Sequence, residues 1–268
     1  MKNPTNEACV NCPVHNVNNL VKLGVEMEGY DFVVALAGNP NVGKSTIFNN
    51  LTGLRQHTGN WPGKTVSRAE GGFVYNNKKF KLVDLPGTYS LLSTSTDEEI
   101  ARNFILFGQP DVTLIVVDST KLERNLNLVL QILEITNRAV LSLNLIDEAK
   151  RKEISINERE LSKILGIPVV STSARNKSGM SELLNYIFEV ATGNYLCKPY
   201  RIKNYSKKFN KSIETLSNKL KIIYPELPNV RWVAIRLLEG DQTIINSVLN
   251  GEIRNLALIN SNTINNVV

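Results

Sequence analysis

Short apolar runs alternate along this chain with stretches in which apolar residues recur every three or four positions. Residues 32–37, 112–118 and 139–144 are strand-sized apolar runs, typical of strands buried on both faces. Leu122, Leu126, Val129, Leu130 and Leu133 fall on one face of a predicted helix. Further strands are predicted at 71–75, 79–84 and 169–171, and further helices from Ser45 and at 97–107, 156–165 and 180–191. This order predicts an α/β fold with a mostly parallel six-stranded sheet and helices on both faces.

Residues that favour turns and helix ends refine this prediction. Asn76-Asn77 between two strands is a hairpin signal, so one strand of the sheet is expected to be antiparallel. Thr96 is expected to cap the helix at 97–107, and Gly166 to end the helix at 156–165. After about Tyr195 the strand signals stop, and residues 205–223, 230–238 and 242–250 are predicted helices. We therefore expect an extension at 1–30, an α/β domain at 31–194 and a small all-α domain at 195–268.

Composition adds limited information. Hydrophobic residues make up 42% of the 268 residues, enough for a substantial core. No apolar run reaches the roughly 18 residues of a membrane helix, and residues 1–30 lack a secretory apolar region, so a cytosolic location is expected. The net charge of +6 comes with basic residues gathered between Lys198 and Lys221. These residues suit a nucleic acid, an anionic membrane or a merely solvated helix face.

Cys9 and Cys12 form a Cys-x-x-Cys pair, with His15 three residues later. This is ligand-type spacing for a metal or a redox pair. Three ligands do not close a structural zinc site, and Cys197 is distant in sequence. A metal or redox sensor and an exposed thiol pair without a fixed metal therefore both remain open.

The strongest chemical signal is Gly38-Asn39-Pro40-Asn41-Val42-Gly43-Lys44-Ser45, which fits G-x-x-x-x-G-K-[ST]. It lies between a predicted buried strand and a predicted helix, the setting that a phosphate-binding loop requires. Its backbone N–H groups would surround an anion. Lys44 would reach the β- and γ-phosphates and Ser45 would hold Mg²⁺. The loop predicts a nucleoside triphosphate site.

Two later strand ends specify the nucleotide. Asp84-Leu85-Pro86-Gly87 would place a carboxylate near Mg²⁺ and a Gly N–H near the γ-phosphate. In Asn144-Leu145-Ile146-Asp147, Asp147 can accept the N1–H and 2-amino groups of guanine, which adenine lacks. Asn144 would tie this loop to the phosphate loop, or the pair would simply cap a helix. Ser173-Ala174-Arg175 would offer a backbone N–H, near Ala174, to the guanine O6.

These four motifs, in this order, resemble those of the Ras-like, translation-factor class of GTPases. Gly59–Val66, Gly38–Asn41 and Asp84–Leu91 further resemble the prokaryotic ferrous-iron transporter FeoB. Residues 231–241 resemble the helical domain of that family, which acts like a nucleotide-dissociation inhibitor. The resemblance covers roughly residues 31–250 and implies a Ras-like P-loop GTPase domain followed by this helical domain.

The resemblance assigns further roles. Thr65 would be the switch-one threonine that binds Mg²⁺ and the γ-phosphate, and Asn41 would help to hold a K⁺ beside the phosphates. Thr88 follows Gly87 where Ras has its water-orienting glutamine, so slow hydrolysis is expected. His57 is expected to be an exposed loop residue. Trp61 is expected either to shield the ribose or base or to pack in a partner interface.

The leading interpretation is the GTP-hydrolysing regulatory part of a ferrous-iron transporter, on the cytoplasmic face of the bacterial inner membrane. Its cofactors would be GTP or GDP, Mg²⁺ and K⁺. Its partners would be the transporter's own membrane domain and small Feo accessory proteins, with no nucleic acid. The alternative is a free-standing Era-like GTPase that binds RNA or the ribosome, although no Gly-x-x-Gly loop or aromatic platform supports it.

The expected site falls into three sets. The catalytic set is Asn41, Lys44, Thr65 and Gly87, and the metal set is Ser45, Thr65 and Asp84 for Mg²⁺ with Asn41 for K⁺. The nucleotide-binding set is Gly38, Asn39, Pro40, Asn41, Val42, Gly43, Lys44, Ser45, Thr46, Gly63, Lys64, Thr65, Asp84, Leu85, Pro86, Gly87, Asn144, Leu145, Asp147, Ser173, Ala174 and Arg175.

Overall fold

The computed structural model describes residues 20–21, 23–53, 56–92, 95–201, 205–251 and 253. Cys9, Cys12 and His15 lie outside the described residues, so the metal or redox hypothesis for them stays a prediction. Contacts divide the chain into two units. The larger unit comprises Met27–Ile105 and Pro110–Ile202, and the smaller one includes Leu106–Gln109 and the helices after Lys203.

The larger unit contains a seven-stranded sheet in the order β2-β3-β4-β1-β5-β6-β7. Its core strands are β1 (Phe32–Gly38), β4 (Lys78–Asp84), β5 (Val112–Asp118), β6 (Ala139–Asn144) and β7 (Val169–Ser171), all parallel to their neighbours within this group. β3 (Ser67–Tyr75) pairs antiparallel with β4 across the Asn76-Asn77 turn, where both asparagines have positive φ. The predicted α/β fold with one hairpin strand is confirmed.

The seventh strand, β2 (Gln56–Asn60), was not predicted, and the expected count of six is one short. β2 pairs antiparallel with β3 at the edge of the sheet. Its sequence, Gln-His-Thr-Gly-Asn, has no apolar alternation, and His57 through Asn60 are exposed. An edge strand that buries no face leaves no hydrophobic pattern from which it could be recognised.

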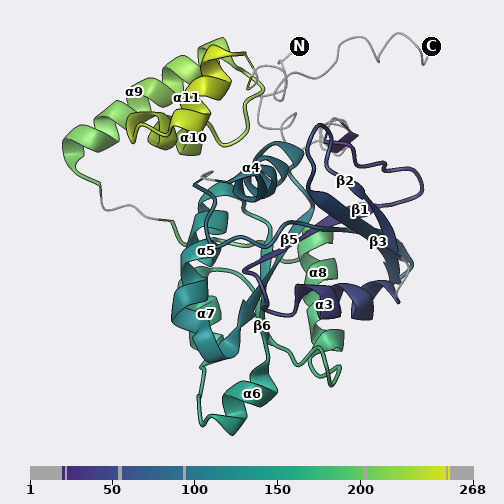
Figure 1. Ribbon diagram of the computed structural model, residues 1–268. Helices are drawn as coiled ribbons and strands as arrows, with labels where there is room; N and C mark the ends of the chain where they lie inside the picture. The colour runs from purple at the N-terminus through teal and green to yellow at the C-terminus, as the bar shows by residue number, and fades with distance from the viewer. Residues whose placement is uncertain are drawn as a thin grey trace, which may run out of the picture. The chain divides into compact units, whose positions relative to one another are not determined.

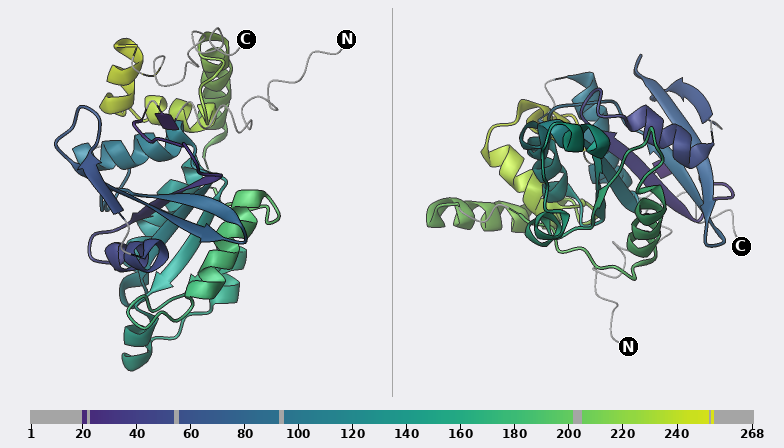
Figure 2. Two further views of the ribbon diagram at one scale, coloured as in Figure 1. Left: turned by 90° about the vertical axis from the view of Figure 1, so that its right-hand side faces the viewer. Right: turned by 90° about the horizontal axis from the view of Figure 1, so that it is seen from below.

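Helices cover both faces of this sheet (Figures 1 and 2). On one face α3 (Lys44–Thr52) and α8 (Met180–Thr192) pack against Val34, Leu36 and Val116 in one core cluster. On the other lies α5 (Leu122–Ile135), which contacts β1 and β5 and buries Val129, Ile132 and Leu133. α7 (Glu158–Leu165) packs against β7 at the sheet edge. Alternate residues of the central strands thus serve two cores, which explains their unbroken hydrophobicity.

The sequence predicted one helix end correctly, misplaced one helix cap and missed several short elements. Gly166 ends α7 in the left-handed conformation, as predicted. α4 (Thr96–Asn103) is capped by Ser95, whose hydroxyl accepts a hydrogen bond from Glu98 N–H at 3.3 Å, so the expected cap at Thr96 is wrong by one residue. α4 continues into the π-helix η1 (Phe104–Gly108). The short elements η2 (Ser119–Lys121) and α6 (Ile146–Arg151) were not predicted.

The smaller unit contains α9 (Lys207–Ile223), α10 (Val230–Leu238) and α11 (Gln242–Leu249), close to the predicted bounds. α10 packs against both of the others and buries Trp232, Val233 and Ile235. Asn229 and Asp241 cap α10 and α11 with their side chains. Among the described residues, no helix is long and apolar enough to span a bilayer.

Candidate functional site

The phosphate loop connects β1 to α3 and is open to solvent at its tip. Asn41 has a φ of 63° and is exposed, as are Ser45 and Thr46 in the first turn of α3. α3 has no side-chain cap at its N-terminus, where Gly43 adopts a left-handed conformation. Free backbone N–H groups and the helix dipole therefore face the same open space, a favourable arrangement for binding an anion.

Asn144 joins the phosphate loop to the base-side loop. Its Nδ2 donates to the carbonyl of Val42 at 2.9 Å, and its Oδ1 accepts from Ala174 N–H at 3.0 Å and from the hydroxyl of Thr172 at 3.4 Å. The side chain is only 1% exposed. A Cβ at Gly43 would lie 2.3 Å from Asn144 Nδ2, so this approach requires glycine. The predicted tie between the two loops is thus present as hydrogen bonds.

Asp147 follows Asn144 with its side chain 31% exposed and available to a base. The Ser173 hydroxyl beside it is the largest cause lowering the pKa of this carboxyl, although Ser173 Oγ forms no hydrogen bond of ordinary geometry. Asn176 Nδ2 approaches Asp147 Oδ2 at 3.4 Å, and Arg151 Nη2 lies 3.7 Å away. The group is therefore an ionised acceptor at neutral pH, as recognition of guanine requires.

The 173–175 segment is arranged differently from the sequence expectation. Ala174 N–H, expected near the guanine O6, already donates to Asn144 Oδ1. A bond to O6 from this group would have to be shared with Asn144 or replace it. The N–H of Arg175 makes no hydrogen bond within the described part of the chain, and the Arg175 side chain is exposed. Arg175 is thus the freer donor of the two.

Asp84 and Lys44 form the phosphate end of the site. Burial raises the pKa of Asp84 to about 6, and the nearby Lys44 opposes this shift. Burial likewise lowers the pKa of Lys44, partly offset by Asp84. One oxygen of Asp84, Oδ1, is buried without a hydrogen-bond partner. A buried, unpaired carboxylate oxygen is what a bound cation would satisfy.

Gly87 lies against the phosphate loop. A Cβ there would come 3.1 Å from Lys44 Nζ and 3.3 Å from the Pro40 backbone. Leu85 N–H donates to Leu36 O at 3.0 Å, and Thr88 N–H approaches Gly38 O at 3.4 Å. A pocket of about 330 Å³ opens here, lined by Lys44, Thr58, Val66, Ser67, Arg68, Ala69, Asp84, Leu85, Pro86, Gly87 and Asp97. The structure thus brings the phosphate loop and Asp84–Gly87 together.

The Gly63–Thr65 segment does not join this group. Thr65 is exposed and does not line the pocket beside Asp84. Lys64 forms an ion pair with Glu99 at 3.1 Å instead. Trp61 is 4% exposed, packs edge-on against Phe104 and lies under Arg68. Both expectations for Trp61, shielding of the nucleotide or a partner interface, give way to a role in the protein's own core.

Four other side chains near the site differ in how they could take part in the chemistry. Thr88 is buried, so its hydroxyl cannot orient an attacking water, and Tyr89 stacks with Arg124 at 4.5 Å. Asn39 is 2% exposed, and neither its amide nitrogen nor its oxygen has a partner. His57 is exposed as expected, but on a strand rather than in a loop.

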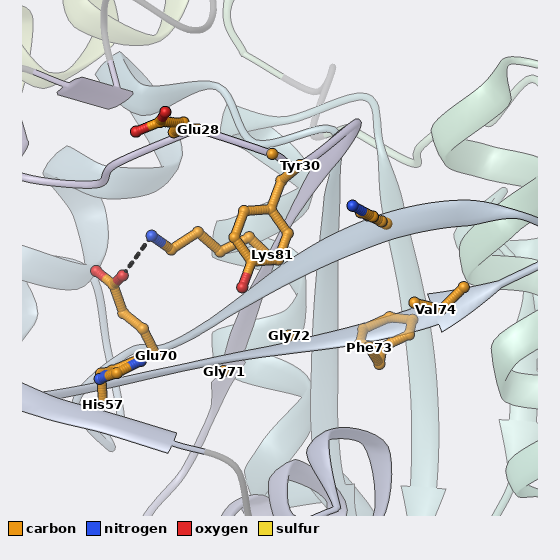
Figure 3. A pocket seen from close by; sticks show the side chains of 11 residues that line it. Glu28, Tyr30, His57, Glu70, Gly71, Gly72, Phe73, Val74 and Lys81 are labelled. Carbon is orange, nitrogen blue, oxygen red and sulfur yellow. Dashed lines mark ion pairs between the residues drawn. The ribbon is translucent and has the colours of Figure 1, made fainter.

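A second pocket, of about 650 Å³, lies beside the β3–β4 ladder (Figure 3). Glu70 and Lys81 meet within it at 2.7 Å, and Tyr30 stands over Lys81. Arg68 lies 2.9 Å from Glu70 on the opposite carboxylate oxygen. No residue of the phosphate loop lines this pocket, and its two buried charged residues, Glu70 and Lys81, pair with each other. It is therefore not the nucleotide site, although it is the larger cavity.

Two residues of the site region escaped prediction. Asn50 Nδ2, on α3, donates to Ala174 O at 2.6 Å, and Thr172 contacts both Asn144 and Ser142. Asn50 carries no recognisable motif, since it lies in an ordinary helical stretch. Thr172 lies two residues before Ala174, and its polar side chain at a buried strand end is the only signal.

The sheet order, the phosphate loop and the Asn144–Asp147 loop define a Ras-like P-loop G domain. Residues 32–187 match the family model of ferrous iron transport protein B, and residues 205–265 match that of the FeoB cytosolic helical domain. The chain belongs to this FeoB family.

Individual relatives agree with this assignment. The chain is 38% identical over 246 residues to an Fe(2+) transport protein A/Fe(2+) transporter FeoB fusion protein of Porphyromonas gingivalis, covering 89% of this chain and 29% of that protein. It is 40% identical over 212 residues to the Fe(2+) transporter FeoB of Salmonella typhimurium, covering 78% and 27%. The chain thus spans less than a third of the length of these curated relatives.

Solved structures show the same similarity. The cytosolic domain of T. maritima FeoB in a GDP form superposes with a TM-score of 0.75 at 41% identity, covering 85% of this chain and 87% of that one. Its GMPPNP form gives 0.74 at 41% identity, with coverage of 85% and 87%. The cytosolic domain of L. pneumophila FeoB gives 0.74 at 32% identity, with coverage of 86% and 90%.

Proposed function

We propose that this chain binds GDP and GTP and hydrolyses GTP slowly, as the cytoplasmic regulatory part of a ferrous-iron transporter. The observation that supports this proposal most strongly is that the Asn144 side chain is hydrogen-bonded both to the phosphate loop, at Val42, and to the base-side loop, at Ala174. One buried amide thereby fixes the spacing between a phosphate site and a guanine-type acceptor. Similarity to FeoB structures with GDP and GMPPNP supports the same ligand class.

In this proposal guanine is selected by Asp147. Its carboxylate is ionised and partly exposed, and it can accept hydrogen bonds from two N–H groups on one edge of the base. Adenine presents no matching pair of donors and would leave this carboxylate unpaired, which costs several powers of ten in affinity. Lys44 and the N-terminus of α3 would hold the phosphates, and Gly87 would stand beside the outermost one.

The residues fit the expected cations to different degrees. Ser45, exposed at the start of α3, and Asp84, with its unpaired Oδ1, are suited to hold Mg²⁺, which would neutralise phosphate charge. Thr65 would reach the same place only after the 61–66 loop moves, because it is now exposed and outside the pocket. Asn41 is exposed and free to offer its amide oxygen to K⁺.

Slow hydrolysis follows from the side chains that are present. Thr88 is buried and Tyr89 is stacked on Arg124, so neither takes the place of a water-orienting glutamine. Charge that develops on the phosphates must then be met by Lys44, the loop N–H groups and the Asn41 site. In the transporter, the position of the 61–66 loop would differ between bound GTP and bound GDP, and this difference would act on the membrane domain.

The test is GTP turnover in KCl and in NaCl at equal ionic strength. We expect turnover at least about tenfold faster in K⁺, which corresponds to an activation barrier lowered by about 1.4 kcal/mol. Asn41→Gly should lose this difference while keeping the left-handed backbone of residue 41 accessible. The matched control is Asn76→Gly, at another left-handed asparagine in the β3–β4 turn, which should keep the full response. Equal rates in both salts for the unaltered chain would refute the K⁺ role.

A further inference from the structure

α9 and α10, neighbouring helices in Figure 1, border a groove of about 370 Å³. The charged residues that line this groove are all basic. Lys208, Lys211 and Lys219 line it together with the hydroxyl of Thr215 and the apolar side chains of Leu216 and Leu238. All of these residues belong to the helical unit. None of them takes part in the nucleotide site.

The three lysines carry unneutralised charge. None forms an ion pair within the described part of the chain, and the acidic Glu239 at the end of α10 pairs with Arg236 at 2.9 Å instead. Their spacing of three and eight residues places them on one face of α9. Ile213 and Leu220, which are 1% and 4% exposed, hold the other face in the core of the unit. The lysine face is therefore turned to solvent.

The same face ends in two unusually exposed apolar side chains. Ile222 and Ile223 are 80% and 63% exposed and follow Lys219 by three and four residues. The stems of the lysines can lie along Leu216 and Leu238 while their charged ends extend outwards. Basic side chains beside exposed isoleucines on one helix face are typical of helices that lie in a membrane interface.

We propose that this face of α9 docks on an anionic phospholipid surface. The lysines would contact headgroup phosphates, and Ile222 and Ile223 would enter the boundary between headgroups and acyl chains. RNA would satisfy the lysines but gives the isoleucines no apolar phase, and no aromatic ring lines the groove for stacking on bases. This inference is independent of nucleotide binding and hydrolysis.

The test is co-sedimentation of the chain with vesicles of phosphatidylcholine alone or with 30% phosphatidylglycerol, about one anionic lipid in three. We expect binding only to the anionic vesicles, weakening as salt rises. Each lysine near such a surface contributes roughly fivefold in partitioning, so Lys208→Gln/Lys211→Gln/Lys219→Gln should lose about 100-fold. The matched control removes the same charge from three exposed lysines of the larger unit, Lys121, Lys152 and Lys163, and should lose far less.

A second variant separates a lipid surface from other anions. Ile222→Ser/Ile223→Ser alters two solvent-exposed positions, so the fold should persist by circular dichroism. It should weaken vesicle binding severalfold and leave any binding of a single-stranded RNA oligonucleotide unchanged. The proposal is overturned by failure to bind anionic vesicles, by equal losses in the groove and control variants, or by tighter binding to RNA than to vesicles. Unchanged vesicle affinity in the isoleucine variant would also overturn it.

Discussion

Replacement of Asn144 by alanine should damage stability and nucleotide binding together. The side chain forms three hydrogen bonds and is 1% exposed. Truncation would leave the carbonyl of Val42 and the N–H of Ala174 without partners, in residues that are 2% and 4% exposed. Each buried unsatisfied group costs about 1–3 kcal/mol, so the free energy of unfolding should fall by about 2–5 kcal/mol.

The same substitution releases the phosphate loop from the base-side loop. GDP affinity should therefore fall by about 100-fold or more, because binding must now order two loops that Asn144 previously held. Unfolding in urea without nucleotide, followed by circular dichroism, measures the first effect, and calorimetric titration with GDP measures the second.

Asn137→Ala is the matched control. Asn137 is exposed and accepts a hydrogen bond from Arg201, so its loss should cost less than about 0.5 kcal/mol and leave GDP affinity unchanged. If Asn144→Ala also lowered the free energy of unfolding by less than about 0.5 kcal/mol, the buried hydrogen bonds of Asn144 would not stabilise the fold. The account of the site as one preorganised surface would then be refuted.

Two further predictions concern carboxylates. Burial raises the pKa of Asp84 to about 6 from 3.8, so its ionisation opposes folding increasingly between about pH 4 and pH 6, fully above pH 6, and only slightly at pH 4. In EDTA without nucleotide, Asp84→Asn should therefore gain about 2–3 kcal/mol in unfolding free energy at pH 7.5 and almost nothing at pH 4, by urea titration; an equal change at both pH values would contradict this. Asp147→Asn should lose at least about 100-fold in GDP affinity and gain affinity for xanthosine diphosphate, whose 2-oxo group can accept from the new amide. Titration with both nucleotides measures this exchange, and unaltered preference for GDP would exclude Asp147 as the base acceptor.

Much of the fold could be predicted because buried strands and helices require apolar residues at positions that recur along the sequence. β5 is wholly buried and appears as the run Val-Thr-Leu-Ile-Val-Val-Asp, and Gly166 ends α7 where the chain needs a left-handed residue. β2 could not be predicted, since an exposed edge strand needs only backbone partners.

For the candidate site, too, some features could be predicted from the sequence and others could not. Motif spacing anticipated the loops around Lys44, Asp84 and Asn144, because short segments at adjacent strand ends must meet. It could not show that Lys64 pairs with Glu99, that Trp61 packs on Phe104, or that Ala174 N–H is already used. These contacts depend on how segments distant in sequence pack, which no local pattern encodes.

The most direct test of guanine recognition compares the affinities of this chain for GDP and ADP in the presence of Mg²⁺. Both ligands share the same phosphates, so the ratio isolates the base and therefore Asp147. The account predicts that GDP binds more tightly by about 10³-fold or more, since adenine would leave the carboxylate unpaired. Affinities within tenfold of each other would contradict it.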